Sequence, residues 1–204
     1  MNVGQFDGGA ATMRGRILGA TAVGAVLLLM LGACSGDDDS AGGSSGTATT
    51  AGQPAQPLPI GVVQEFDVAS NFHVTDVVQY PQTPPVGGDH AGVWQNCGFY
   101  DKPIYSETGV HSMEHSAVWI TFRPDLPADQ IDQIRALAEE PYTLASPWGE
   151  GELGAPIVLS AWGVQLAIDS LPSDQATEFL STYREALTAP EPSFPCTGGT
   201  SQTK

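Results

Sequence analysis

Two histidines and a glutamate lie within five consecutive positions, as His111, Glu114 and His115. Imidazole nitrogens and carboxylate oxygens are ligands for zinc, copper, nickel and iron. On a helix, the spacing His-x-x-Glu-His is that of a class of zinc peptidases, in which the glutamate acts as a base beside a zinc-bound water. The motif leaves three alternatives open: a catalytic metal site, a metal site without catalysis, and a buried polar motif that only stabilises the fold.

The residues that follow the motif favour an extended chain over a helix. The segment AVWITF at 117–122 is β-branched and aromatic, which is typical of a strand, and no helical stripe of apolar residues accompanies the motif. We therefore predict that the motif leads into a strand, with His111, Met113 and His115 on one face and Glu114 pointing away. Such a face would admit copper as well as zinc, and it disfavours a peptidase.

One region rich in proline and glycine contains all four histidines of the chain, which are His73, His90, His111 and His115. Three or four imidazoles are enough to close a transition-metal site. We predict that His90, His111 and His115 converge on one site, with His73 as a fourth member. Copper and zinc are the candidate ions.

The N-terminal segment has the organisation of a bacterial secretion signal. Arg14 and Arg16 precede an apolar run that ends at Cys34 and is too short and too rich in glycine and alanine for a membrane span. The run ends in Leu-Gly-Ala-Cys, which resembles a lipobox, the sequence that directs a diacylglycerol to the cysteine thiol. We predict that residues 1–33 are a lipoprotein signal peptide, with Met13 as an alternative start, and that Cys34 is lipidated.

A lipid on Cys34 would place the protein at the extracytoplasmic face of the bacterial cell membrane. Residues 34–57 contain no aliphatic side chain larger than alanine. Such a segment buries too little apolar surface to offset its ordering entropy, so we predict a disordered tether. The remainder is predicted to be one globular domain at 58–196, followed by a disordered tail at 197–204.

Two further cysteines, Cys97 and Cys196, lie in the part predicted to be exported. In an oxidising compartment, two such cysteines most often pair. We predict a disulfide between them, and the alternatives are a thiolate metal ligand and a free thiol.

The chain is strongly acidic, with 23 Asp and Glu against 7 Lys and Arg and a formal net charge of −16. This charge repels the phosphates of nucleic acids, so no nucleic-acid partner is expected. The membrane, reached through the lipid anchor, is the one partner that we predict, and the sequence identifies no protein partner.

The hydrophobic pattern predicts an α+β domain. Strands are predicted at 60–68, 117–122, 142–146, 155–163 and 164–170, and helices at 126–140 and 173–187. Ser173 is the predicted N-cap of the second helix. The economical arrangement places the two helices on one face of a mainly antiparallel sheet, ferredoxin-like in spirit, after a long ordered Pro/Gly-rich loop at 72–100.

Several short segments together resemble those of a known bacterial family. They are HV…Y…PP at 73–85, Gly88 and His90, GFYDKPI at 98–104, VHSMEH at 110–115, FRPDLP at 122–127, SAWG at 160–163 and APEP at 189–192. On these segments the sequence resembles the exported bacterial proteins catalogued as domain of unknown function 3105. It departs from their pattern at Gly87, where the family has serine, and at Met113, where it has leucine. The resemblance implies one fold unit and a shared histidine set, but no reaction.

The predicted function is that of a membrane-anchored extracytoplasmic lipoprotein with a histidine cluster for a transition metal, acting by binding rather than by turnover. One alternative is a metal-dependent hydrolase or oxidoreductase with Glu114 as general base. Another is a purely structural envelope protein whose histidines are satisfied internally. Asp101 and Glu107 are candidates to orient the imidazoles through hydrogen bonds.

Overall fold

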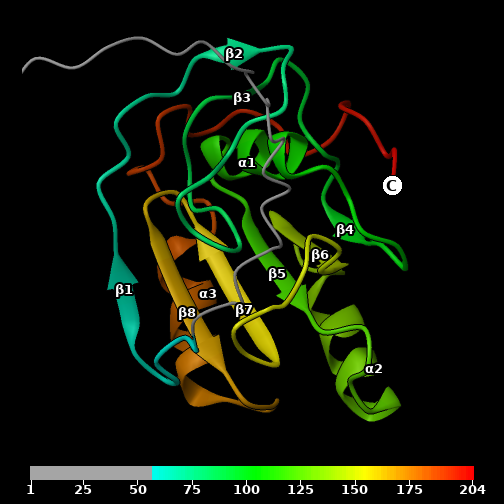
Figure 1. Ribbon diagram of the computed structural model, residues 1–204. Helices are drawn as coiled ribbons and strands as arrows, with labels where there is room; N and C mark the ends of the chain where they lie inside the picture. Colours follow the sequence, from blue (N-terminus) through cyan, green and yellow to red (C-terminus); the bar gives the residue numbers. More distant parts are fainter. Residues whose placement is uncertain (1–56) are drawn as a thin grey trace, which may run out of the picture. The chain divides into compact units, whose positions relative to one another are not determined.

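Six strands form one mixed sheet in the computed structural model, which describes residues 57–204 (Figure 1). The strand order is β1-β8-β7-β5-β6-β4. The strands are β1 (Val63–Glu65), β4 (Gly98–Phe99), β5 (Val118–Phe122), β6 (Thr143–Pro147), β7 (Ile157–Ala161) and β8 (Val164–Ile168). β6 pairs in parallel with β5 and with β4, and the other neighbours are antiparallel. The predicted α+β class with a mainly antiparallel sheet is confirmed.

The predicted signal peptide, Cys34 and the tether as far as residue 56 lie outside the described residues. Within the described range, no helix is both long and apolar enough to cross a membrane.

The central strands β5, β7 and β8 are buried along their whole length. Their β-branched and aliphatic residues suit strands that are covered on both faces. Leu159 pairs with Ile120 on one side and with Leu166 on the other. The turn between β7 and β8 contains Gly163 at φ +74°, a conformation that glycine adopts without strain.

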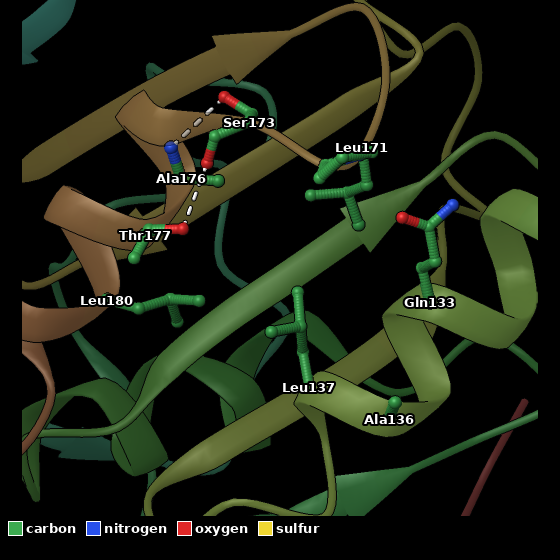
Figure 2. Close-up of a pocket in the computed structure, with 9 residues that line it drawn as sticks. Gln133, Ala136, Leu137, Leu171, Ser173, Ala176, Thr177 and Leu180 are labelled. Carbon is green, nitrogen blue, oxygen red and sulfur yellow. Dashed lines mark hydrogen bonds between the residues drawn. The ribbon is translucent and has the colours of Figure 1, made fainter.

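Two helices cover one face of this sheet, as predicted. They are α2 (Ala128–Leu137) and α3 (Asp174–Tyr183). Ile134 of α2 and Phe179 of α3 pack against the side chains of β5 that include Ile120. Burial of a side chain such as Phe179 contributes about 1.5–3 kcal/mol. The predicted N-cap is confirmed, because the Ser173 hydroxyl accepts a hydrogen bond of 3.2 Å from the amide of Ala176 (Figure 2).

A third helix, α1 (Ser106–Glu114), packs on the opposite face of the sheet, and it corrects the prediction of an extended motif. Val110 and Met113, three residues apart, pack against Trp119 of β5. Gly109 admits the indole closely, since a Cβ there would lie 2.8 Å from a Trp119 ring carbon. Met113 is therefore a core residue, and the side of α1 that bears His111 and Glu114 is free to form a polar site.

Two short strands within the Pro/Gly-rich segment bring the first two histidines together. β2 (His73–Val74) and β3 (His90–Ala91) pair in parallel, with His73 opposite His90. Figure 1 shows this pair above α1, and β3 contacts that helix. The long loop of the prediction is thus an ordered support for two histidines.

The C-terminal segment returns to the same region. Cys97 and Cys196 form a disulfide, with Cα atoms 5.4 Å apart. The amide of Asn96 donates to the carbonyl of Thr200, and the amide of Lys204 donates to the carbonyl of Pro103, each at 2.8 Å. Residues 197–204, which the sequence suggested as a disordered tail, make these contacts with the residues before α1.

Candidate metal centre

Four side chains from three elements bring their ligating atoms close together. They are His73 of β2, His90 of β3, and His111 and Glu114 of α1. One ligating atom of each lies within 4.8 Å of the others. The ring centroids of His73 and His111 are 4.7 Å apart, and those of His90 and His111 are 4.8 Å apart. The parallel pairing of β2 and β3 beside α1 therefore brings together residues that span more than 40 positions of the sequence.

A second group overlaps the first through His111. It consists of His111, His115 and Glu191, whose ligating atoms also lie within 4.8 Å of one another. His115 is the C-cap of α1. Glu191 comes from the C-terminal segment, where its amide donates a hydrogen bond of 3.1 Å to the carbonyl of Glu114. That bond satisfies a carbonyl at the helix end and fixes Glu191 beside the histidines.

The cluster is almost entirely removed from solvent. His90, His111, Glu114 and His115 are each no more than 3% exposed, while the side chain of His73 is 50% exposed. Buried ionisable groups are rare unless they are paired or coordinate a metal. The arrangement is a buried ligand set with one histidine open to the surroundings.

Hydrogen bonds to backbone carbonyls determine which ring nitrogen carries the proton. Nδ1 of His90 lies 2.8 Å from the carbonyl of Gly88, Nδ1 of His111 lies 2.6 Å from that of Ala91, and Nδ1 of His115 lies 3.1 Å from that of Pro195. A carbonyl only accepts, so Nδ1 must be the donor in each case. In the neutral rings the lone pair is then on Nε2, as in histidines that bind metals through Nε2.

The Nε2 atoms face other acceptors instead of donors. Nε2 of His90 is 2.8 Å from Oε2 of Glu114, and Nε2 of His111 is 3.1 Å from Nε2 of His115. The first pair is close but poorly aligned for a hydrogen bond. Among the residues that the structure describes, neither of its two atoms has a hydrogen-bond partner. Each pair of facing acceptors requires a cation between its members, either an added proton or a metal ion.

The pKa of His111 indicates whether its own ring carries such an added proton. Burial, reinforced by repulsion from the other histidines, lowers the pKa of His111 from 6.5 to about 4, although the hydrogen bond to the Ala91 carbonyl opposes this shift. His111 is thus neutral at neutral pH. Its Nε2 lone pair is available to a metal without prior loss of a proton.

Glu114 lies at the centre of the cluster and not away from it, because the motif is helical. Its Oε1 accepts a hydrogen bond of 2.8 Å from the Asn71 amide, and its Oε2 faces both His90 and, at 3.8 Å, Nε2 of His73. Asp101 is exposed, and Glu107 accepts a hydrogen bond from the amide of Val78. In the described part of the chain, neither of these two carboxylates belongs to the ligand groups.

Sequence reasoning did not find Asn71 and Glu191. Both contact the motif only through the tertiary fold, since they lie 43 positions before Glu114 and 76 after His115 in the sequence. The one available signal was the APEP segment that contains Glu191, which was noted as a segment shared with the family and not as a ligand.

An apolar cavity on the other face of the sheet carries no comparable chemistry. It lies between α2 and α3, and Figure 2 shows Leu137, Leu171 and Leu180 around it. Within the described residues, its lining includes no titratable side chain.

The family of this chain follows from a family model that matches residues 73–198. The chain belongs to the family described as Protein of unknown function (DUF3105). The matched range contains the complete histidine set, both carboxylates of the centre and both cysteines of the disulfide. No curated protein and no solved structure matches the chain.

Proposed function

We propose that this protein binds a transition-metal ion at the extracytoplasmic face of a bacterial membrane. His90, His111 and Glu114 are the buried ligands, and His73 is the exposed ligand through which the ion enters. The main support for the proposal is a pair of buried hydrogen-bond acceptors that face each other. Nε2 of His90 and Oε2 of Glu114 are 2.8 Å apart without a shared hydrogen bond.

The separations from Glu114 suit one ion that it shares with His73 and His90. Two ligand atoms that each lie about 2.1 Å from an ion can be at most about 4.2 Å apart. The separations from Oε2 of Glu114 are 2.8 Å to His90 and 3.8 Å to His73, which correspond to angles of roughly 84° and 130° at the ion. Zn²⁺ has no geometric preference from its d electrons and tolerates this spread, so zinc is the first ion to test and copper the second.

The proposed location rests on the N-terminal sequence. The apolar run ends in Leu31-Gly32-Ala33-Cys34, and the acidic Gly/Ser-rich stretch that follows provides a tether. A tether of this length has an r.m.s. reach of roughly 26 Å, which keeps the domain close to the lipid surface. The disulfide between Cys97 and Cys196 agrees with an oxidising compartment.

The position of Glu114 supports binding over catalysis. A general base needs a carboxylate oxygen that reaches a substrate or an activated water. The side chain of Glu114 is 2% exposed, its Oε1 accepts from Asn71 and its Oε2 faces His90. Oε1 is therefore held by Asn71, and Oε2 is directed at the histidines instead of at solvent.

The test is metal analysis of the full-length protein, extracted in detergent, together with thermal unfolding after chelation and addition of Zn²⁺ or Cu²⁺. Ligand binding to the folded state raises the melting temperature by mass action. We expect a rise with at least one of the two ions, and its loss in the His111→Gln variant. Asp101→Asn, at an exposed position outside the centre, is the control and should keep the rise.

The structural alternative gives a different result. If an added proton alone satisfies the cluster, neither ion changes the melting temperature of the wild-type protein, and the purified protein contains no stoichiometric metal. That outcome rejects the proposal.

A further inference from the structure

We propose that His111, His115 and Glu191 form a second metal position, so that the centre holds two ions of the zinc or copper class. This inference rests on the proposed function, because His111 also lies among the ligands of the first ion. When both positions are filled, His111 binds the second ion, and His73, His90 and Glu114 keep the first. Each ion then has two imidazoles and one carboxylate.

The distances of the second group suit direct coordination. Nε2 of His111 and Nε2 of His115 are 3.1 Å apart, and Nε2 of His115 and Oε2 of Glu191 are 3.5 Å apart. For ligands about 2.1 Å from one ion, these separations correspond to angles of roughly 95° and 113°. Both angles are near the tetrahedral value that zinc adopts in proteins. The Glu191 side chain, 40% exposed, has room to adjust its carboxylate.

Two separate pairs of acceptors argue for two ions. Nδ1 of His111 and Nδ1 of His115 both donate to carbonyls, so in the neutral rings two lone pairs face each other across 3.1 Å. One ion between His90 and Glu114 satisfies the His90–Glu114 pair, but it leaves the lone pair of His115 without a cation. A second ion between His111 and His115 satisfies it.

The C-terminal segment is held so that it completes this position. The amide of Glu191 donates to the carbonyl of Glu114, the carbonyl of Pro195 accepts from Nδ1 of His115, and Cys196 is bonded to Cys97. These contacts fix the segment on both sides of the second group. Hydrogen bonds of this kind orient a metal-binding imidazole and support its affinity.

Aromatic rings enclose the same pair of histidines. The ring centroid of Trp94 is 4.8 Å from that of His115 and 5.6 Å from that of His111, and the Phe194 ring is 5.2 Å from that of His115. An apolar enclosure excludes water and strengthens the interaction between an ion and its ligands. Glu191 remains the exposed ligand through which the second ion enters.

The two positions predict two unequal binding events. The second ion takes His111 from the first and lies close to another cation, so it binds more weakly. The experiment is a calorimetric Zn²⁺ titration of the chelator-treated full-length protein in detergent, with native mass spectrometry to count the ions. We expect two ions for the wild-type protein, with a strong and a weaker phase.

Two substitutions separate the positions. Glu191→Gln and His115→Gln should each remove the weaker phase and leave one ion bound. Glu178→Gln, which changes an exposed glutamate of α3, is the matched control and should keep both phases. Because Glu191 is partly exposed, its substitution tests the position even where His115→Gln fails to fold.

Other outcomes overturn the inference in distinguishable ways. A single strong ion whose binding is unchanged by Glu191→Gln removes the second position but leaves the proposed function intact. Two ions that both persist in Glu191→Gln and His115→Gln place the second ion elsewhere. Absence of any bound ion rejects the proposed function as well.

Discussion

Nε2 of His90 and Oε2 of Glu114 lie 2.8 Å apart in a buried site, where a neutral His90 places an acceptor opposite an acceptor. Helix α1 supplies the carboxylate and the short strand β3 supplies the imidazole. The Gly88 carbonyl holds the proton of His90 on Nδ1, away from Glu114. The pair is therefore unsatisfied without a cation, and this makes Glu114 the most informative residue to change.

The variant Glu114→Gln should abolish stabilisation by metal without lowering the stability of the metal-free protein. A glutamine has nearly the same shape, and its side-chain N–H₂ can donate to Nε2 of His90, which the carboxylate cannot do. The loss of a charged ligand removes most of the affinity for the ion. The measurement is the melting temperature with and without Zn²⁺ after chelation.

Asp101→Asn serves as the control for Glu114→Gln, because it removes an exposed carboxylate outside the centre. A Zn²⁺ shift in Glu114→Gln equal to that of the wild-type protein would show that Glu114 is not a ligand.

Acid should destabilise the metal-free protein through His111. The pKa of this residue is about 4 in the folded protein and 6.5 as its ordinary value, so the unfolded chain binds a proton first as pH falls. The stability is fully present above pH 6.5 and decreases as the pH falls toward 4. A shift of this size corresponds to a loss on the order of 3 kcal/mol.

Urea unfolding at pH 7, 5.5 and 4 measures this effect, with His111→Gln as the matched variant. The variant should show a smaller decrease in the free energy of unfolding over the same range, because glutamine does not titrate. Equal pH dependence in both proteins would contradict the assignment of a buried neutral His111.

The sheet and the two helices of one face were predictable because their burial follows hydrophobicity. The runs that became β7 and β8 are aliphatic except for Ser160 and Gln165, and Ser173 marks the start of α3 with a typical N-cap. Helix α1 was not predictable in this way, because much of its buried surface is polar. The hydroxyl of Ser112 donates to the Gln95 carbonyl, and that of Thr108 donates to the Gln95 side chain. Such hydrogen bonds bury small polar residues without an apolar stripe.

The same helix explains which part of the centre the sequence could indicate. Confinement of all histidines to residues 73–115 pointed to a cluster, because a compact fold of one segment can bring them together. The role of Glu114 depended on helical periodicity, which places it on the same side as His111 instead of opposite to it. Glu191 depends on the return of the chain to α1, and no local pattern encodes that.

Substitution of Cys34, the predicted lipidation site, should change membrane association. The Cys34→Ala variant lacks the thiol that accepts the lipid. Because this lipid is the only anchor that we propose, the variant should lose its attachment to the membrane. We expect the wild-type protein to partition into the detergent phase and the variant to remain in the aqueous phase. Cys97→Ser is the control cysteine change, and it should not alter partitioning. Membrane association that survives Cys34→Ala would contradict the anchor.

Removal of the disulfide should affect both stability and the second metal position. Cys97 and Cys196 close a loop with a sequence separation of 99, for which the chain-entropy model gives a stabilisation of about 4 to 5 kcal/mol. That is a large part of the 5–15 kcal/mol typical of a domain. The bond also anchors Pro195, whose carbonyl accepts from Nδ1 of His115.

The Cys97→Ser/Cys196→Ser double variant should therefore unfold at a lower urea concentration and lose the weaker Zn²⁺ phase before the stronger one. The strong phase depends on His90 and Glu114, whose elements β3 and α1 contact each other directly, so it should be lost later than the weaker phase. Wild-type protein treated with a reductant that does not bind metal is the control, and it should reproduce both effects. Thiol labelling of the denatured, unreduced wild-type protein should detect neither Cys97 nor Cys196. Labelling of both, or a double variant with unchanged stability, would contradict the role given to the bond.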